Sequence, residues 1–256
     1  MTTEKNDIIN ANKVAEITLL FWLMKVIATT LGETFGDFLS MTLNLGYLTG
    51  IYVTLIFFLA VLLAQLSVKE YIPVFYWLVI IGTTTLGTEI SDFMDRSLHL
   101  GYAAGSLILF VFLVTTLFLW HQRHGSLRVY PIFKMNKEIY YWIAILFSNS
   151  LGTAFGDFLS DNLGLSYFDG AFICAGIILI VILLHYKTKI NEIVLFWIAF
   201  VFTRPFGATF GDFLTKPISK GGFNLGTLPA SLVSILLMTF LIIISHRKLK
   251  PIRIEN

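Results

Sequence analysis

The chain has 256 residues, of which 56% are hydrophobic, 15% are aromatic and only 13% are charged, and its mean hydropathy is +0.79. A soluble domain carries about a quarter charged residues, so this composition excludes an ordinary soluble protein and indicates an integral membrane protein. The net charge of +2 gives no reason to expect a nucleic-acid partner, and the single cysteine, Cys174, excludes an internal disulfide.

Eight segments are long and apolar enough to cross a membrane as helices, which requires about 20 residues each. In chain order they cover residues 16–39, 47–67, 72–94, 101–120, 138–159, 167–186, 192–214 and 225–245. We expect no cleavable signal peptide, because the residues before the first segment are polar and the segment lacks a small-residue cleavage site. The polar stretch 121–137 is predicted to be a cytoplasmic linker between two halves, residues 1–120 and 138–256.

The basic residues of the loops predict the topology. Only Arg96, Lys216 and Lys220 fall on one side of the predicted membrane, and thirteen Lys and Arg residues fall on the other. We therefore expect both termini to be cytoplasmic. The thirteen are Lys5, Lys13, Lys69, Arg123, Arg128, Lys134, Lys137, Lys187, Lys189, Arg247, Lys248, Lys250 and Arg253.

A fourfold internal repeat organises the chain. In each repeat a glycine follows a tryptophan by ten residues and precedes an Asp-Phe pair by five. The glycines are 55, 65 and 55 residues apart, so a two-repeat unit recurs with a period of 120. The repeated residues are Trp22, Trp77, Trp142 and Trp197; Gly32, Gly87, Gly152 and Gly207; Asp37, Asp92, Asp157 and Asp212; and Phe38, Phe93, Phe158 and Phe213.

We predict an all-α polytopic membrane protein in which four two-helix repeats share one orientation and are related by a pseudo-symmetry axis along the membrane normal. The first helix of each repeat carries the acids, and the second is expected to face lipid or to fill space. The four aspartates should lie at one depth, towards the extracytoplasmic helix ends, as a ring or as two facing pairs. The tryptophans should lie about 22 Å away from them along each helix.

Small residues recur four apart beside the aspartates, a spacing that lets helices approach closely. These pairs are Gly32/Gly36, Gly87/Ser91, Gly152/Gly156 and Gly207/Gly211. A belt of hydroxyl and amide side chains is expected below the level of the acids, formed by Thr29, Thr30, Thr84, Ser148, Asn149 and Thr203.

Carboxylates inside a membrane span are costly and usually face a cavity, a partner or a pathway. The spans contain six acids, the four aspartates together with Glu33 and Glu89, against two bases, Lys25 and Arg204. Full ionisation would leave four uncompensated negative charges, which favours uptake of protons or a cation over an inert salt-bridge network. Carboxylate and hydroxyl ligands suit hard cations such as Mg²⁺, Ca²⁺ or Mn²⁺. We expect Asp37, Asp92, Asp157 and Asp212 to bind the ion and Glu33 and Glu89 to bind or couple it.

The two bases allow alternatives. Arg204 is expected to pair with Glu33 or Glu89, although a guanidinium could instead receive an anionic substrate. Lys25 lies about 10 Å below Gly32, and we expect it to extend to the cytoplasmic side rather than act as a buried counter-ion. Glu138, near the start of its helix, is expected to complement the helix dipole.

The segments "FWLMK…LGETFGDFLS", "YWLVI…LGTEISDF", "YWIAI…LGTAFGDFLSD" and "FWIAF…FGATFGDFL" resemble a bacterial membrane-protein family defined only as a repeat of unknown function. Its members have four tandem repeats, each with two spans and one tryptophan, and are often labelled membrane-anchored proteins. The resemblance covers nearly the whole chain and implies the repeat architecture and a bacterial inner membrane, but no activity. A weaker resemblance is to cation exchangers with a Glu-x-Gly-Asp signature; here two residues separate Glu33 from Gly36, and no basic residue follows Asp37.

Three classes of function remain open from the sequence. The leading hypothesis is a transporter or channel for a hard cation or protons, with the lipid bilayer and a small ion as partners and no cofactor beyond a divalent cation. A membrane scaffold or sensor with a structural polar core is the second, and an intramembrane enzyme with Glu33 and Asp37 as an acid–base pair is the third. A transporter of a small anion centred on Arg204 is a further alternative. We expect no enzyme, because no nucleophile accompanies Glu33 and Asp37; a homo-oligomer is left open.

Overall fold

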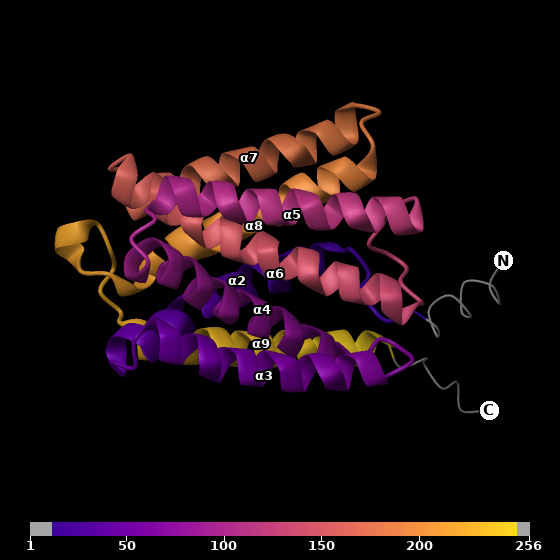
Figure 1. The fold of residues 1–256 in the computed structure, drawn as a ribbon, viewed down its shortest axis with the longest axis horizontal. Helices are drawn as coiled ribbons and strands as arrows, with labels where there is room; N and C mark the ends of the chain where they lie inside the picture. The colour runs from indigo at the N-terminus through magenta and orange to yellow at the C-terminus, as the bar shows by residue number, and fades with distance from the viewer. Residues whose placement is uncertain (1–11, 250–256) are drawn as a thin grey trace.

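The computed structural model describes residues 12–249; residues 1–11 and 250–256, which include Lys5, Lys250 and Arg253 of the topology count, lie outside the described part. Within residues 12–249 the chain forms eight long helices and no strand. The helices lie side by side and alternate in direction (Figure 1). They are α2 (Leu19–Asp37), α3 (Tyr47–Ser67), α4 (Pro73–Asp92), α5 (Tyr102–His124), α6 (Met135–Asp157), α7 (Tyr167–Lys187), α8 (Glu192–Thr215) and α9 (Thr227–Leu249).

The repeats differ in how the acidic helix ends. After the aspartate, α2, α4 and α6 each continue into one π-helical turn, η1 (Phe38–Thr42), η2 (Phe93–Ser97) and η3 (Phe158–Asn162). In the fourth repeat, α8 runs on to Thr215, Pro217 follows, and the connection contains the short 3₁₀ turn η4 (Ile218–Lys220). Single π turns are uncommon and are often found at functional sites. The backbone thus departs from α-helical geometry directly after three of the four aspartates.

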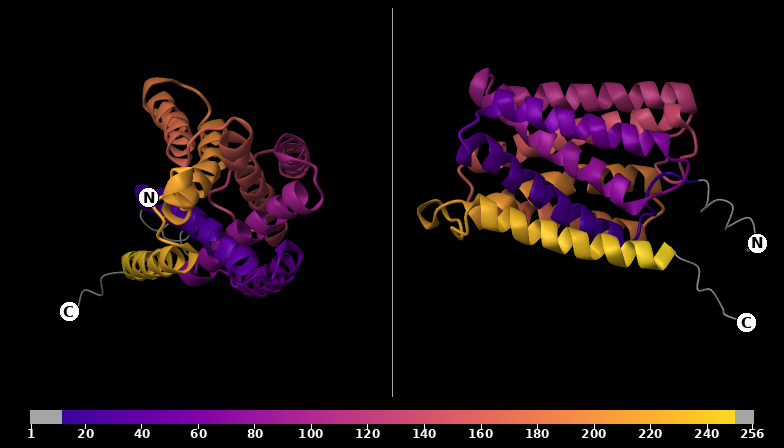
Figure 2. Two further views of the ribbon diagram at one scale, coloured as in Figure 1. Left: turned by 90° about the vertical axis from the view of Figure 1, so that its left-hand side faces the viewer. Right: turned by 90° about the horizontal axis from the view of Figure 1, so that it is seen from below.

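Four inner helices form a closed ring, and four outer helices surround it (Figure 2, left). In the ring, α2 packs on α4, α4 on α6, α6 on α8, and α8 on α2. Each outer helix packs on the inner helix of the following repeat: α3 on α4, α5 on α6, α7 on α8 and α9 on α2. The four repeats therefore run in the same direction around one axis, and the axis lies along the bundle.

The glycine of each repeat lies where neighbouring inner helices approach. A Cβ atom at Gly32 would overlap Thr84 of α4, one at Gly152 would overlap Arg204 of α8, and one at Gly207 would overlap Thr29 of α2. A Cβ at Gly87 would lie 3.0 Å from the backbone nitrogen of Ser150 in α6. These contacts repeat around the ring with one register, because the repeats are equivalent, and a larger side chain would push the helices apart.

The second small residue of each pair does not behave as uniformly as the spacing predicted. A Cβ atom at Gly36 would lie 3.0 Å from the facing threonine of α4, and one at Gly211 would lie 3.0 Å from the Cβ of Glu33. Gly211 therefore leaves room for the Cβ and Cγ atoms of Glu33, and not for the backbone of the facing helix. At Gly156 the approach is less tight, because a Cβ would lie 3.4 Å from the Cβ of Ala208 and 3.6 Å from the backbone of Pro205, which are ordinary contact distances. The small side chain of Ala208 leaves room for an alanine at Gly156.

Length and composition make seven of these helices suitable to cross a membrane: α2, α3, α4, α5, α7, α8 and α9. The outer helices expose large apolar side chains such as Leu107, Phe172 and Leu236, which indicates a lipid-facing surface. The exception is α6, predicted as the span 138–159. It contains Ser148, Asn149 and Ser150, all of them buried against its neighbours in the ring. Its polarity belongs to the interior of the bundle, and its crossing of the membrane remains a prediction.

The connection between the two halves is shorter than the predicted linker 121–137. Residues 121–124 form the last turn of α5, and α6 already begins at Met135. Between them, Val129 and Ile132 are buried in the hydrophobic core. Residues 125–134 are therefore packed onto one end of the bundle.

Candidate functional site

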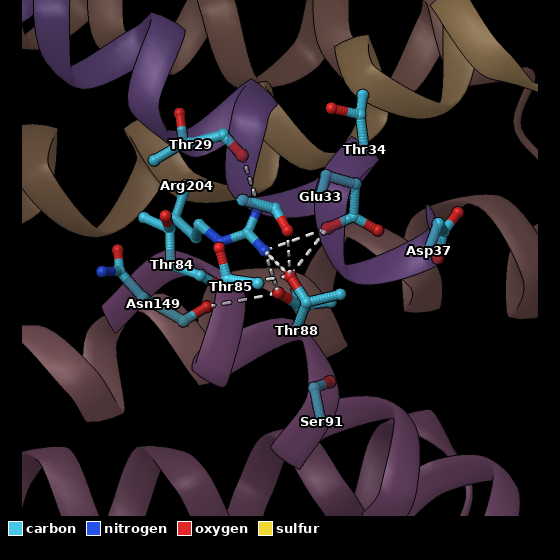
Figure 3. A network of polar contacts seen from close by, with 12 residues as sticks. Thr29, Glu33, Thr34, Asp37, Thr84, Thr85, Thr88, Ser91, Asn149 and Arg204 are labelled. Atoms are coloured by element: carbon cyan, nitrogen blue, oxygen red, sulfur yellow. Dashed lines mark hydrogen bonds and ion pairs between the residues drawn. The ribbon is translucent and has the colours of Figure 1, made fainter. Parts of the chain in front are cut away.

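A buried ion pair lies at the centre of the ring (Figure 3). Arg204 of α8 is fully buried, and its guanidinium lies 2.9 Å from a carboxylate oxygen of Glu33 in α2. The same guanidinium donates hydrogen bonds to the hydroxyls of Thr88 in α4 and Thr153 in α6, and to the backbone carbonyl of Thr29 at 3.2 Å. One side chain therefore connects all four inner helices. Of the two acids considered as partners of Arg204, the structure selects Glu33.

Lys25 does not extend to the cytoplasmic side as expected. It is fully buried, and its ammonium donates a hydrogen bond of 2.7 Å to the amide oxygen of Asn149 and lies 4.0 Å from the ring centroid of Phe200. Asn149 in turn donates to the hydroxyl of Thr83. The position of Lys25 in the sequence does not indicate that its side chain points into the ring. A second basic side chain therefore lies inside the bundle, on the side of Arg204 away from the aspartates.

The four aspartates are buried and divided into two pairs, each bridged by one base. Arg96 lies 3.2 Å from Asp157 and 3.8 Å from Asp92. Lys216 lies 2.6 Å from Asp37 and 3.1 Å from Asp212. Both bases stand nine residues after the repeat glycine, in repeats 2 and 4, so the period of 120 residues relates the two bridges. Of the two arrangements considered, a ring or facing pairs, the structure shows pairs.

Arg96 and Lys216 change the charge balance. The sequence placed them in loops, but their side chains reach back to the aspartates. Each pair of aspartates therefore has one base between its two carboxylates, and the π-helical turns η2 and η3 add two further acids, Asp95 and Asp161. Burial alone would lower the pKa of Lys216, but the carboxylates of Asp212 and Asp37 raise it above its ordinary value. Lys216 therefore stays a cation while it bridges them.

Three carboxylates converge closely enough to share one ion. Single oxygens of Glu33, Asp37 and Asp212 all lie within 4.8 Å of one another, and the three residues are buried. Next to them a cavity of about 410 Å³ is lined by Asp157, Asp212, Arg96 and Lys216, together with Met41, Tyr102, Asp161, Tyr167 and Lys220. The acidic end of the ring therefore has a polar cavity beside its carboxylates.

Aromatic side chains fill the opposite end of the ring. The tryptophan of one repeat packs on an aromatic residue of the preceding repeat around the ring: Trp77 on Phe21 with ring centroids 5.6 Å apart, Trp142 on Tyr76 at 5.3 Å, and Trp22 on Phe196 at 5.7 Å. Trp77 and Trp142 are almost completely buried. These three tryptophans thus pack neighbouring repeats against one another at this end of the ring.

The chain before α2 covers this aromatic end. Lys13 is buried and forms an ion pair with Glu138, and its backbone nitrogen donates to the carbonyl of Ile132 at 3.0 Å. Glu138 also accepts hydrogen bonds from Gln65 at 2.9 Å and from Trp142 at 3.3 Å. Glu138 lies in the first turn of α6, the position from which an acid complements the helix dipole as expected. It is also fully buried and connects the segment before α2 to the bundle.

Glu89 points away from the axis. It lies on the face of α4 that packs on α3, seven residues after Gly82, which contacts Phe58 of α3. A Cβ atom at Gly50 of α3 would overlap the Glu89 carboxylate. Glu89 is fully buried, and neither of its carboxyl oxygens has a hydrogen-bond partner among the described residues.

The remaining polar residues selected from the sequence also lie inside the bundle. The side chains of Thr29, Thr30, Thr84, Ser148, Asn149 and Thr203 are all buried. Thr84 donates to the carbonyl of Ala28 across the α2–α4 contact. Sequence reasoning missed Thr88 and Thr153, which contact Arg204, and it missed the bridging role of Arg96 and Lys216. Their common distance from the repeat glycine would have revealed both bridges.

The comparisons agree with this architecture. A family described as Repeat of Unknown Function (DUF347) matches the chain four times, at residues 20–71, 75–126, 140–191 and 195–250. Neither a curated protein nor a solved structure matches the chain. The four matches cover most of the sequence, and the chain belongs to this repeat family.

Proposed function

We propose that this member of the four-repeat family is a multi-pass membrane transporter or channel for a hard cation, such as Mn²⁺, Mg²⁺ or Ca²⁺, or for protons. The observation that carries the proposal is the convergence of Glu33, Asp37 and Asp212 within 4.8 Å at the acidic end of the ring. Hard divalent cations take carboxylate oxygens at about 2.0–2.6 Å, so oxygens spaced this closely can contact one ion.

Lys216 supports this assignment, because its ammonium already lies between Asp37 and Asp212. A position that holds an ammonium group between two buried carboxylates favours positive charge. The side chain of Lys216 is 20% exposed, so it can move away when a cation arrives. We therefore assign the ion to the space that Lys216 vacates, with Glu33 as the third ligand.

The two ends of the ring support transport rather than storage. The carboxylates adjoin a cavity at one end, while aromatic side chains and the segment around Lys13 close the other. A site that is accessible from one side and closed on the other is the arrangement that alternating access requires.

The topology belongs to the same proposal. The excess of basic residues at the aromatic end favours a cytoplasmic position for that end and for both termini, in a bacterial inner membrane. All eight helices, α6 included, would then cross the bilayer. Reporter fusions that are active on one side of the membrane, placed after residue 249 and in the connection 221–226, test it; a C-terminal fusion active outside the cytoplasm would overturn it.

Flux assays in liposomes test the function. Purified protein reconstituted with a Mn²⁺-sensitive dye inside the vesicles should admit Mn²⁺, and the double replacement Asp37→Asn/Asp212→Asn should abolish the signal. Asp169→Asn is the control, because Asp169 lies exposed at the start of α7 and should leave flux unchanged. Wild-type flux no greater than that of empty vesicles, for Mn²⁺, Mg²⁺, Ca²⁺ and protons alike, would contradict the proposal and favour a scaffold.

An anion transporter centred on Arg204 has less support. The two terminal nitrogens of Arg204 already donate to Glu33, Thr88, Thr153 and the Thr29 carbonyl. An anionic substrate would have to displace Glu33 from the centre of the ring. We propose no enzymatic role, because the site offers paired charges and hydroxyls without an activated nucleophile.

A further inference from the structure

We propose that Glu89 is a proton-binding site that couples cation movement to proton movement in the opposite direction. The inference rests on the proposed function and deepens it, because Glu89 lies outside the group of Glu33, Asp37 and Asp212 to which the cation is assigned. It comes from the geometry of the contact between α3 and α4.

The surroundings of Glu89 do not compensate an anion. The side chain is fully buried, and both carboxyl oxygens lack hydrogen-bond partners among the residues that the structure describes. An isolated buried carboxylate is very unfavourable, and such a group takes up a proton instead of remaining charged. Ionisable residues inside membrane spans are rare, and they mark ion pathways and proton relays.

The facing residue of α3 is a glycine. Gly50 leaves room for the carboxyl group, and any side chain there would overlap it. The equivalent position of α5, Gly105, is also a glycine, and the carboxylate of Asp95 from η2 fills the space beside it. At the level of Glu89 the other repeats carry Thr34, Ala154 and Thr209, so a carboxyl group occurs at this position in the second repeat alone. The contact between α3 and α4 is therefore closed around one neutral carboxyl group.

The charged groups near Glu89 connect it to the ion site. From α2, Glu33 lies nearby, because it accepts a hydrogen bond of 3.4 Å from Thr88, the residue next to Glu89. Arg204 pairs with Glu33, and Lys216 pairs with Asp37. On its own helix and the turn that follows, Asp92, Asp95 and Arg96 are the nearest ionisable groups, and from α6 it is Asp157, which Arg96 holds. From α3 only Tyr47, bonded to Arg96, stands near this end. No base pairs with Glu89 among the described residues.

This arrangement makes the cation and the proton compete. Without a divalent cation, Arg204 pairs with Glu33 and Lys216 with Asp37, whereas no base among the described residues pairs with Glu89, so Glu89 holds a proton and α3 stays closed on α4. A divalent cation that replaces the ammonium of Lys216 adds positive charge at the ion site next to Glu89, and the proton can then leave Glu89 for water. When the cation leaves, Glu89 takes a proton back, so each cation cycle moves a proton the other way.

Proton release on cation binding tests the inference. In weakly buffered detergent solution containing a pH indicator, addition of Mn²⁺ to the wild-type protein should release about one proton per bound ion. Glu89→Gln should bind Mn²⁺ and lose that release, because glutamine is an uncharged isostere of the protonated acid. Glu192→Gln is the matched control, since Glu192 is exposed at the start of α8 and should release as wild type does.

The outcomes separate the two proposals. Absence of Mn²⁺, Mg²⁺ and Ca²⁺ binding by the wild-type protein would defeat the divalent-cation site of the proposed function, and the coupling with it. Intact binding with the same proton release from wild type and Glu89→Gln would overturn the coupling role of Glu89 and leave the function standing. Glu89→Asp keeps a titratable group and should retain release, so loss of release in that folded variant also counts against the proposal. In liposomes, Glu89→Gln should carry Mn²⁺ down its gradient without generating a pH difference.

Discussion

Replacement of Arg204 by leucine tests whether a single buried ion pair holds the ring together. The change removes the guanidinium that contacts Glu33 at 2.9 Å, Thr153 at 2.6 Å and the Thr29 carbonyl at 3.2 Å. It leaves the Glu33 carboxylate buried without its partner. Loss of one partner from a buried pair costs about 3–5 kcal/mol. Because a chain of this size loses about 2–4 °C of Tm per kcal/mol, we expect Tm to fall by about 6–20 °C.

Thermal unfolding in detergent, followed by tryptophan fluorescence, measures the effect, and a double replacement isolates the pair. The double variant Arg204→Leu/Glu33→Gln removes both charges of this pair, so neither is left buried without its partner. Its Tm should therefore recover at least half of the decrease seen in Arg204→Leu. Arg123→Leu, at the exposed end of α5, is the control for removal of an arginine. Either of two results would refute the reasoning: Arg204→Leu no less stable than Arg123→Leu, or a double variant whose loss equals the sum of the two single losses.

Three further predictions follow from the packing and the bridges. Gly207→Leu should destabilise the protein by about 1–3 kcal/mol through overpacking against Thr29, whereas Gly176→Leu on α7, where a Cβ has open space, should leave Tm nearly unchanged; equal losses would argue against the ring of glycine contacts. Lys13→Met leaves Glu138 buried without its cation, so Tm should fall well below that of Lys69→Met, an exposed lysine, and matching Tm values would show that the segment before α2 contributes little. Lys216→Met removes the internal cation between Asp37 and Asp212; since a charged hydrogen bond contributes about 1.5–3 kcal/mol, the Kd for Mn²⁺ should tighten by about tenfold or more. Lys189→Met, an exposed lysine between α7 and α8, should leave that Kd unchanged, and weaker binding by Lys216→Met would contradict its role as a competitor for the ion.

Much of the fold was predictable because the repeat and the apolar runs act on the scale of whole helices. The helix positions follow from about 20 apolar residues per span. The common direction of the repeats follows from two helices per repeat, and the depth of the four aspartates follows from their fixed distance to Gly32 and its equivalents. These features depend only on the course of the backbone, which the apolar runs and the repeat spacing determine.

The closeness of each helix contact was less predictable than its position. The small-residue spacing marks both Gly156 and Gly211 as points of close approach. The structure shows a tight contact at Gly211, against the stem of Glu33, and an ordinary one at Gly156, against Ala208. The difference lies in the residue on the facing helix, which the spacing within one helix does not specify.

The direction and reach of individual side chains were also harder to predict. Lys25 lies near a helix start, as a lysine that extends to the cytoplasmic side would, yet Asn149 of another helix binds it inside the ring. Arg96 and Lys216 fall beyond the apolar segments, and their long side chains return to the aspartates. Glu89 is three residues from Asp92, so helical spacing places both acids on one face of α4. Glu89 is also seven residues from Gly82, however, and both of these residues contact α3. Each of these results depends on a tertiary neighbour that the local sequence does not contain.

The central claim, a cation site formed by Glu33, Asp37 and Asp212, is tested most directly by equilibrium binding of Mn²⁺ to the purified protein, measured by electron paramagnetic resonance of the free ion. We expect saturable binding by the wild-type protein and by Asp169→Asn, and loss of that binding in a folded Asp37→Asn/Asp212→Asn variant. The cation site would be contradicted if the wild-type protein left all the Mn²⁺ free in solution and if its Tm did not rise with Mg²⁺, Ca²⁺ or protons. A double variant that binds Mn²⁺ as well as the wild-type protein does would also contradict it.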